Sequence, residues 1–191
     1  MKVKLEGEKN VLNYFPLATI LRPSIVYSVD DNFTTNMMTL LNRLPVFPIY
    51  YGGKTKFTPI HCDDLTDIIF HVITNKIESK IIECVGPEEI SMKEILKKLL
   101  KLIEKKRILL PFPVFFANLS ASFFELFPKP LLTRDQIRLL KYDNVVSGKY
   151  KTNFEIGVPS IRLFDIEVKK YCYMWKDGGE FSTNKYNSNK K

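Results

Sequence analysis

The chain has 191 residues and a formal net charge of +8, with 45% hydrophobic and 26% charged side chains. This balance is typical of a globular protein and excludes an intrinsically disordered one, while the length predicts one domain or little more. Three widely spaced cysteines fit neither a disulfide framework nor a zinc site, so we expect a reducing, cytoplasmic compartment. No apolar run reaches the length of a membrane span, and the N-terminus lacks the hydrophobic stretch of a secretory signal.

The first third of the chain alternates predicted helices and strands. A helical pattern over residues 4–14 precedes a buried strand over residues 18–26, which Pro23 interrupts. Residues 33–44 have helical periodicity, and residues 50–57 form a glycine turn between short extended pieces. This alternation favours an α/β fold.

The middle of the chain continues the pattern. Asp63 or Asp64 is a suitable N-cap for a helix that ends near Asn75, and residues 81–85 form a strand. The expected sheet has only these two convincing central strands, although a parallel sheet needs more. We therefore expect that the chain lacks the beginning of its own fold, which would leave sheet edges open at residues 18–26 and 81–85.

A strongly basic helix follows. Ser91 and Glu94 form a capping box, and residues 93–107 carry 7 basic and 2 acidic side chains. A short strand is expected at residues 108–110, followed by an apolar, aromatic and proline-rich stretch over residues 111–132.

The last third is predicted to be mainly helical. We expect short helices over residues 133–141 and 161–175, and a mobile lysine- and asparagine-rich tail over residues 178–191. Residues 1–177 then form one folded unit.

Three segments in this order and spacing resemble the second half of an extended or atypical short-chain dehydrogenase/reductase. They are the helix with residues 4–8 (KLEGE) followed by residues 19–27 (TILRPSIVY), then residues 57–64 (FTPIHCDD), and then residues 85–87 (VGP) before the helix opened by Ser91. Residues 129–136, 143–146 and 175–179 are similar to the branch of that family that includes the NAD(P)-binding accessory subunit of respiratory complex I and bacterial relatives. The resemblance reaches to about Phe181. It implies the C-terminal portion of a Rossmann-type fold, that is, the last strands and a mostly helical substrate domain, with the N-terminal dinucleotide-binding half missing.

The resemblance places Lys4 at the lysine of the family's Tyr-x-x-x-Lys motif. That lysine lowers the tyrosine pKa and holds the nicotinamide ribose, but the tyrosine would fall one residue before Met1. The glycine-rich dinucleotide loop is also absent from the sequence. We therefore expect a C-terminal fragment, either of a gene with an upstream start or of a split gene, that is not active alone. The alternative is an independently evolved small domain.

By the same resemblance, Pro23, Ser24, Ile25 and Val26 wall the nicotinamide pocket, although a buried strand that ends at a proline explains them equally. A complete protein would bind NAD(P), and no cofactor is expected for this chain alone, because the loop that binds the pyrophosphate is missing.

The resemblance also names candidates for the substrate pocket. Asp30, Asp31 and Asn32 lie in a loop over that pocket in the family, and ordinary turn chemistry is the alternative explanation. His61 lies beside Asp63 and Asp64 at a strand–helix junction, which suggests a metal or an acid/base pair, although one of the aspartates is explained as the cap of the following helix. We favour a structural role for His61 and expect no metal. Ser28 stands where many active members have glycine.

Three functions remain open. The first is an NAD(P)-binding protein whose role in complex I is accessory or assembly-related. The second is part of an NAD(P)-dependent oxidoreductase or sugar-nucleotide epimerase that turns over. The third is a cofactor-free basic adaptor for a membrane or a protein. The expected partners are the N-terminal Rossmann half and complex I or the inner face of the respiratory membrane, and not nucleic acid.

Overall fold

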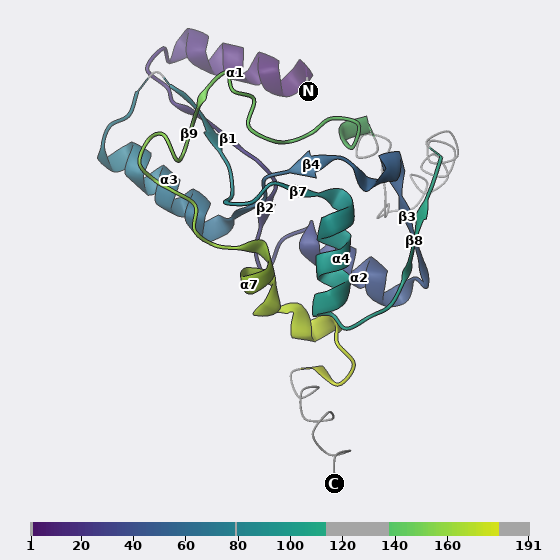
Figure 1. Ribbon diagram of the computed structural model, residues 1–191. Coiled ribbons are helices and arrows are strands. Elements are labelled where there is room, and N and C mark those ends of the chain that lie inside the picture. Colours follow the sequence, from purple (N-terminus) through teal and green to yellow (C-terminus); the bar gives the residue numbers. More distant parts are fainter. Residues whose placement is uncertain (1, 79, 114–137, 180–191) are drawn as a thin grey trace.

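The computed structural model describes residues 2–78, 80–113 and 138–179, which form an α/β arrangement (Figure 1). In chain order the elements are α1 (Lys2–Tyr14), β1 (Ile20–Pro23), β2 (Val26–Tyr27), α2 (Thr34–Arg43), β3 (Val46–Ile49), η1 (Tyr50–Gly53), β4 (Lys56–Phe57), β5 (Ile60–His61), α3 (Cys62–Thr74), β6 (Ile81–Cys84), β7 (Ile90–Ser91), α4 (Met92–Leu102), β8 (Ile108–Pro111), β9 (Lys151–Thr152), α7 (Phe164–Lys169) and η2 (Cys172–Trp175). Among the described residues, no helix is both long and apolar enough to cross a bilayer.

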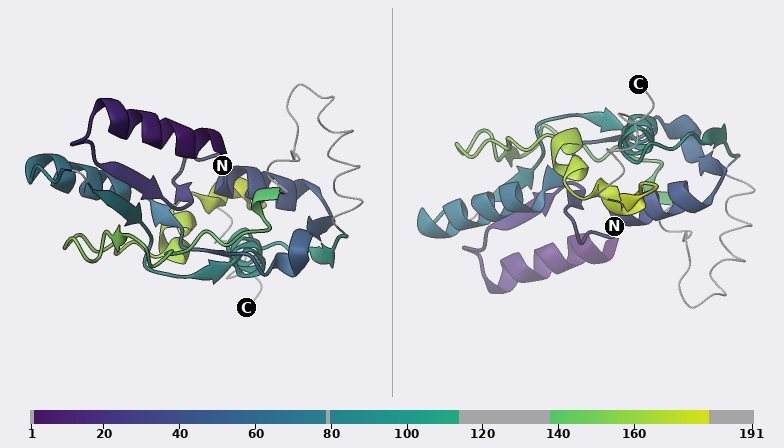
Figure 2. Two further views of the ribbon diagram at one scale, coloured as in Figure 1. Left: turned by 90° about the horizontal axis from the view of Figure 1, so that it is seen from above. Right: turned by 90° about the horizontal axis from the view of Figure 1, so that it is seen from below.

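The main sheet has three parallel strands in the order β1-β6-β9. Helix α3 covers one face of it, where Ile68 lies in a small core with Ile82 and Cys84 of β6. Helix α1 lies on the opposite side of this sheet (Figures 1 and 2). The sheet is therefore covered by a helix on each side, as expected for parallel strands.

A second and larger core lies beside this sheet. Helices α2, α4 and α7 meet there around fully buried side chains, which include Tyr27, Met38, Leu41, Ile95, Leu99 and Val168. The capping box at the start of α4 is present: the Ser91 hydroxyl accepts from the Glu94 N–H, and the Glu94 carboxylate accepts from the Ser91 N–H. The apolar side chains of this helix are thus buried, and its predicted start is confirmed.

The strand predictions need three corrections. The strand expected at residues 18–26 divides at Pro23, so β1 pairs with β6 whereas β2 pairs with β5. Strand β9 is missing from the prediction, because two residues carry no periodic signal. Residues 81–85 do not supply a free sheet edge as expected, because β6 lies between β1 and β9.

The helix predictions need two corrections. His61, rather than Asp63 or Asp64, is the N-cap of α3, and both aspartates lie in its first turn. The helix expected at residues 161–175 is the short helix α7 followed by the 3-10 helix η2. The predictions for residues 114–132, most of 133–141 and 180–191 lie outside the described residues.

The turn after β6 is packed against the turn before β5. A Cβ atom placed on Gly86 would lie 1.6 Å from the Pro59 carbonyl oxygen, and the Gly86 N–H donates to the Thr58 carbonyl. Only glycine permits this approach of two backbones. Gly7, on the exposed side of α1, has no atom within 4 Å of such a Cβ.

We predict opposite effects for two glycine-to-alanine substitutions. Gly86→Ala should lower the free energy of unfolding by about 3 kcal/mol because the backbone must move. Gly7→Ala should raise it by about 0.5 kcal/mol because alanine favours a helix. Pulse proteolysis in urea, with the chain fused to a protease-resistant carrier, measures both. Equal stability of Gly86→Ala and wild type would contradict the packing.

Candidate functional site

Helix α1 is fastened to the main sheet by one bidentate ion pair. The Arg22 guanidinium on β1 donates from Nε to Glu8 Oε1 at 3.0 Å and from Nη2 to Glu8 Oε2 at 2.5 Å. The same guanidinium lies 4.7 Å from the centre of the Tyr150 ring. The pair raises the pKa of Arg22 and lowers the pKa of Glu8, so both groups stay charged.

This ion pair brings two of the predicted cofactor positions to one end of the sheet. Lys4 lies one helical turn before Glu8 on the same helix face, and Arg22 directly precedes Pro23. Helix α1 returns into β1, so its N-terminal turn lies toward the carboxyl end of that strand (Figures 1 and 2). Lys4 itself is exposed. In parallel α/β sheets, ligands bind at this carboxyl edge.

The segment after Pro23 is tied to both neighbouring strands. The Ser24 N–H donates to the Cys84 carbonyl at 3.0 Å, and the Ser24 hydroxyl donates to the Asn144 carbonyl at 3.2 Å. The Ile25 carbonyl accepts from the Ile60 N–H at 2.9 Å. The alternative explanation of this segment, a strand that ends at a proline, therefore accounts for these hydrogen bonds. Pro23 itself is exposed at the end of β1.

The predicted substrate loop is organised by Asp31. Its carboxylate accepts five hydrogen bonds, from the Ser28, Phe33, Thr34 and Thr35 N–H groups and from the Thr34 hydroxyl. This pattern orders the turn before α2, as the turn interpretation expects. Asp30 is exposed, and the Asn32 carbonyl accepts from the Asn36 side chain.

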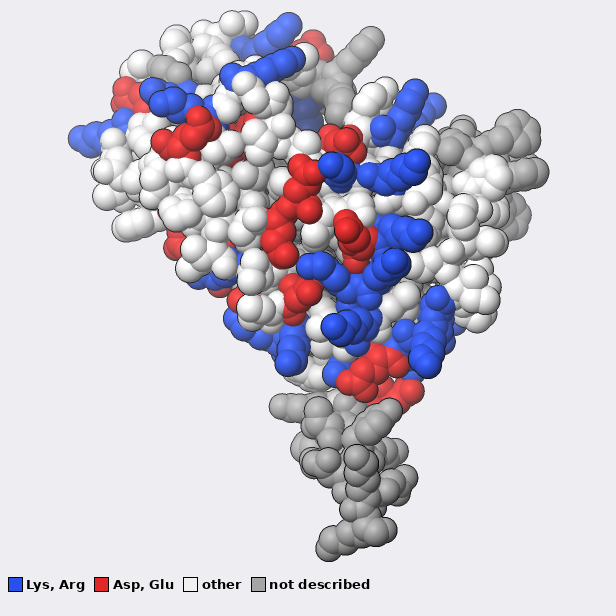
Figure 3. Space-filling model, in the orientation of Figure 1, with Lys and Arg blue, Asp and Glu red and all other residues white. Residues whose placement is uncertain are grey.

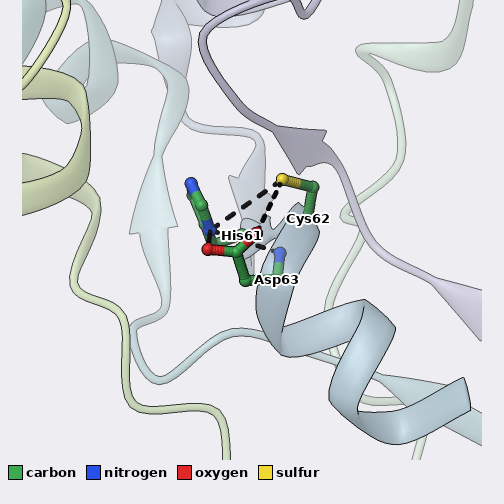
Figure 4. A group of neighbouring side chains, drawn as sticks. All are labelled: His61, Cys62 and Asp63. Atoms are coloured by element: carbon green, nitrogen blue, oxygen red, sulfur yellow. Dashed lines mark hydrogen bonds and ion pairs between the residues drawn. The ribbon is translucent and has the colours of Figure 1, made fainter. Parts of the chain in front are cut away.

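His61 begins α3 and lies beside two further ligating side chains (Figure 4). Its Nδ1 accepts from the Asp63 N–H at 3.3 Å and lies 3.5 Å from Asp63 Oδ2. The Cys62 thiol donates to Asp63 Oδ1 at 3.5 Å and lies 4.0 Å from His61 Nδ1. Burial, followed by the Asp63 carboxylate, raises the pKa of Cys62, so the thiol is the resting form.

The other side of the His61 ring faces buried groups. Its Nε2 lies 3.9 Å from Glu167 Oε2, and its ring meets Tyr27 edge-on at 5.3 Å. Because Nδ1 accepts a hydrogen bond, the proton of a neutral ring belongs on Nε2, facing Glu167. Tyr27 is fully buried, and its hydroxyl donates to the Arg162 carbonyl. Burial, followed by the Glu167 charge, raises the Tyr27 pKa, which leaves it a neutral donor.

Arg162 joins the C-terminal segment to the first turns of α3. Its guanidinium contacts Asp64 at Oδ1 and Asp67 Oδ2 at 3.3 Å, and its N–H donates to Asp64 Oδ2 at 3.2 Å. The Asp64 side chain is only 3% exposed. Sequence analysis missed this contact, because the partners are 98 positions apart and no local pattern links them.

The chain is similar in sequence to subunits of mitochondrial NADH dehydrogenase, although no protein-family model matches it. It is 28% identical to the NADH dehydrogenase [ubiquinone] 1 alpha subcomplex subunit 9 of Arabidopsis thaliana, over 96% of this chain and 48% of that protein. The mouse subunit of the same name is 25% identical, over 92% of this chain and 48% of that protein. The Neurospora crassa NADH-ubiquinone oxidoreductase 40 kDa subunit is 23% identical over 81% of this chain. The chain spans about half the length of the curated relatives that it matches.

The fold is shared with nucleotide-sugar enzymes of known structure. A dTDP-4-dehydrorhamnose reductase from Clostridium acetobutylicum superposes with a TM-score of 0.61 at 22% identity, over 89% of this chain and 53% of that chain. The Thermus thermophilus UDP-glucose 4-epimerase, solved in complex with NAD, superposes with a TM-score of 0.59 at 12% identity, over 89% and 50%. These matches confirm the α/β, Rossmann-type class expected from the sequence, and they cover about half of each enzyme.

We predict that the buried partner of Arg162 matters for stability and the exposed partner does not. Asp64→Ala should lower the free energy of unfolding by about 2 kcal/mol. It removes a buried acceptor, but Arg162 remains partly exposed and keeps Asp67. Asp67→Ala removes a carboxylate that is 63% exposed and should change stability by less than about 0.5 kcal/mol. Similar losses in both variants, measured by pulse proteolysis, would contradict this assignment.

Proposed function

We propose that this chain, a relative of the complex I subunit 9 proteins with the fold of the short-chain dehydrogenases/reductases, is the C-terminal half of an NAD(P)-binding accessory or assembly protein of complex I. In this proposal the nucleotide stabilises the protein instead of turning over. The protein would be peripheral to the respiratory membrane, on its inner face, and the other half of the Rossmann domain would be its immediate partner.

The observation that supports this proposal most directly is the ion pair between Glu8 and Arg22. It holds the helix of Lys4 against the strand that ends in Pro23, so the proposed ribose and nicotinamide positions share one end of the sheet. A cofactor at this end would meet the Lys4 ammonium on one side and the backbone of residues 23–26 on the other. The glycine-rich loop for its pyrophosphate would come from the N-terminal half.

A turning-over enzyme is the second candidate, because the solved structures that share the fold include a reductase and an epimerase. Two features favour the non-catalytic role. Ser28 stands where many active short-chain dehydrogenases/reductases have glycine. In the adjoining loop, the Asp31 carboxylate accepts hydrogen bonds from backbone N–H groups and is therefore not free to bind a substrate. The named relatives are subunits of a large assembly. Reduction or oxidation of NAD(P) by the complete protein would favour the enzyme.

The surface charge argues against a purely electrostatic adaptor. Lys and Arg side chains gather over α4, but acidic side chains lie among them (Figure 3). Lys98 lies 3.4 Å from Glu88 and 3.0 Å from Asp165, and Lys105 lies 2.6 Å from Asp177. These pairs offset part of the positive charge that the sequence alone assigns to residues 93–107.

We predict that NAD(P)H binding requires both halves and depends on Lys4. The chain alone should show no binding isotherm. A version joined to an N-terminal dinucleotide-binding half, from the upstream reading frame or the Arabidopsis relative, should bind NADH or NADPH. Lys4→Ala in the joined protein should weaken binding about tenfold, since it removes a charged hydrogen bond to the ribose. The matched control is Lys9→Ala, which removes another exposed lysine from the same helix. Binding by the lone chain, or equal losses in both variants, would refute the proposal.

We also predict that the isolated chain is poorly soluble. Helix α1 and the residues after it expose Val3 by 82%, Tyr14 by 82% and Phe15 by 69%. Such a surface favours aggregation unless a partner covers it. The soluble yield should rise on co-expression with the N-terminal half, as measured by size-exclusion chromatography. A monodisperse, cooperatively melting chain in the absence of that half would contradict this expectation.

A further inference from the structure

Three side chains with metal-binding atoms converge where β5 meets α3. The ligating atoms of His61, Cys62 and Asp63 lie within 4.8 Å of one another (Figure 4). An imidazole nitrogen, a thiol sulfur and a carboxylate oxygen form a mixed donor set suited to Zn²⁺. The sequence spacing does not suggest such a site, because adjacent residues rarely converge unless a strand turns directly into a helix.

The distances between these atoms suit a tetrahedral ion. Bonds of about 2.0 to 2.3 Å at tetrahedral angles place ligand atoms about 3.3 to 3.6 Å apart. In the structure, His61 Nδ1 lies 3.5 Å from Asp63 Oδ2, Cys62 Sγ lies 3.5 Å from the other carboxylate oxygen, Asp63 Oδ1, and Cys62 Sγ lies 4.0 Å from His61 Nδ1. With one oxygen from Asp63, the three ligand atoms lie within 4.8 Å of one another, so small rotations of the Cys62 and Asp63 side chains would bring them to tetrahedral separations. The carboxylate of Asp63 is 58% exposed, which leaves room for water as a fourth ligand.

A carboxylate lies beside the His61 ring nitrogen that would not bind the metal. The free nitrogen of such a histidine usually faces a carboxylate, which orients the ring. Here His61 Nε2 faces Glu167 Oε2 at 3.9 Å; this oxygen also accepts a hydrogen bond from Lys170 Nζ, and the Glu167 side chain is only 10% exposed. The carboxylate comes from α7, so it is independent of the helix that carries the other ligands.

Two existing contacts would be given up without leaving a buried group unpaired. The bond from the Asp63 N–H to His61 Nδ1 is long, at 3.3 Å, and this N–H lies in the first turn of an exposed helix end. Asp63 also lies 3.5 Å from Arg162 Nε, but Arg162 keeps Asp64 and Asp67 as partners.

We propose that His61 Nδ1, Cys62 Sγ and an Asp63 carboxylate oxygen bind one Zn²⁺ ion, with water as the fourth ligand and Glu167 orienting the imidazole. The cysteine binds as a thiolate, and its proton passes to solvent. The site would clamp β5 to the start of α3, and it does not depend on whether a nucleotide binds.

Titration with Co²⁺ tests this proposal, because Co²⁺ can occupy a Zn²⁺ site and gives a thiolate-to-metal absorption band when a cysteine thiolate binds it. The full 191-residue chain, fused to a carrier without cysteine or a histidine tag, is titrated with Co²⁺. We expect a thiolate-to-cobalt absorption band that saturates at one equivalent and disappears when Zn²⁺ is added. Cys62→Ser should abolish the band. Cys172→Ala, which removes a buried thiol from the core around α2, α4 and α7, should retain it.

A second pair of variants separates ligation from folding. Asp63→Asn should weaken Co²⁺ binding at least tenfold, and Asp67→Asn, one turn later on α3, should leave it unchanged. Pulse proteolysis of the metal-free proteins confirms that each variant is folded. Absence of the band in the folded wild-type chain, its persistence in Cys62→Ser, or equal weakening by both asparagine variants would overturn the proposal.

Discussion

Strands β1 and β6 run parallel over four residue pairs, and parallel neighbours cannot be joined by a tight turn. The chain must return along the sheet between them, and α3 completes this return while it covers one sheet face. The carboxyl ends of both strands then lie at the same edge. Ser24 follows β1 there and Gly86 follows β6, and each is held by a backbone bond to the neighbouring segment. The place of the candidate cofactor segment after Pro23 depends on this topological constraint.

On the sheet face that α1 covers, the arrangement depends on which carboxylate pairs with the Arg22 guanidinium. Arg22 and Glu83 are register partners across β1 and β6, so their side chains start on the same face of the sheet. Arg22 nevertheless pairs with Glu8, and the buried Glu83 carboxylate accepts from the Ser147 N–H at 2.9 Å. Each carboxylate therefore anchors a different segment: Glu8 holds α1, and Glu83 holds the loop that leads to β9.

Features with a local cause were predictable from the sequence, whereas those set by distant contacts were not. The start of α4 follows from the Ser91–Glu94 capping box, and the strand at residues 81–84 follows from a short apolar run. The predicted N-cap of α3 was wrong because histidine is an unusual N-cap residue. The His61 ring accepts the capping hydrogen bond here because β5 ends directly at the start of the helix. The three-residue group around His61 likewise depends on a strand–helix junction that spacing rules do not describe.

The same limit applies to the candidate site. Lys4 and the segment after Pro23 were identified by resemblance, but nothing local in the sequence brings them together. Their common position results from the Glu8–Arg22 pair, which spans 14 positions, and from the antiparallel course of α1 and β1. The contact between Asp64 and Arg162 spans 98 positions and left no signal.

Helices α1 and α4 differ in a way that bears on the proposed partner. Helix α4 buries its apolar stripe, including Ile95 and Leu99, against α2 and α7, as a helix of a complete domain does. Helix α1 contacts the sheet through Glu8 and leaves Val3 and Leu5 exposed. Strand β1, beneath it, pairs within the described residues only with β6, so its other edge is open. Exposed apolar side chains beside an open parallel strand suit a partner that supplies a strand and a covering element together. The other half of a Rossmann domain would supply both, whereas a membrane would cover the apolar side chains of α1 but would leave the backbone of β1 unpaired.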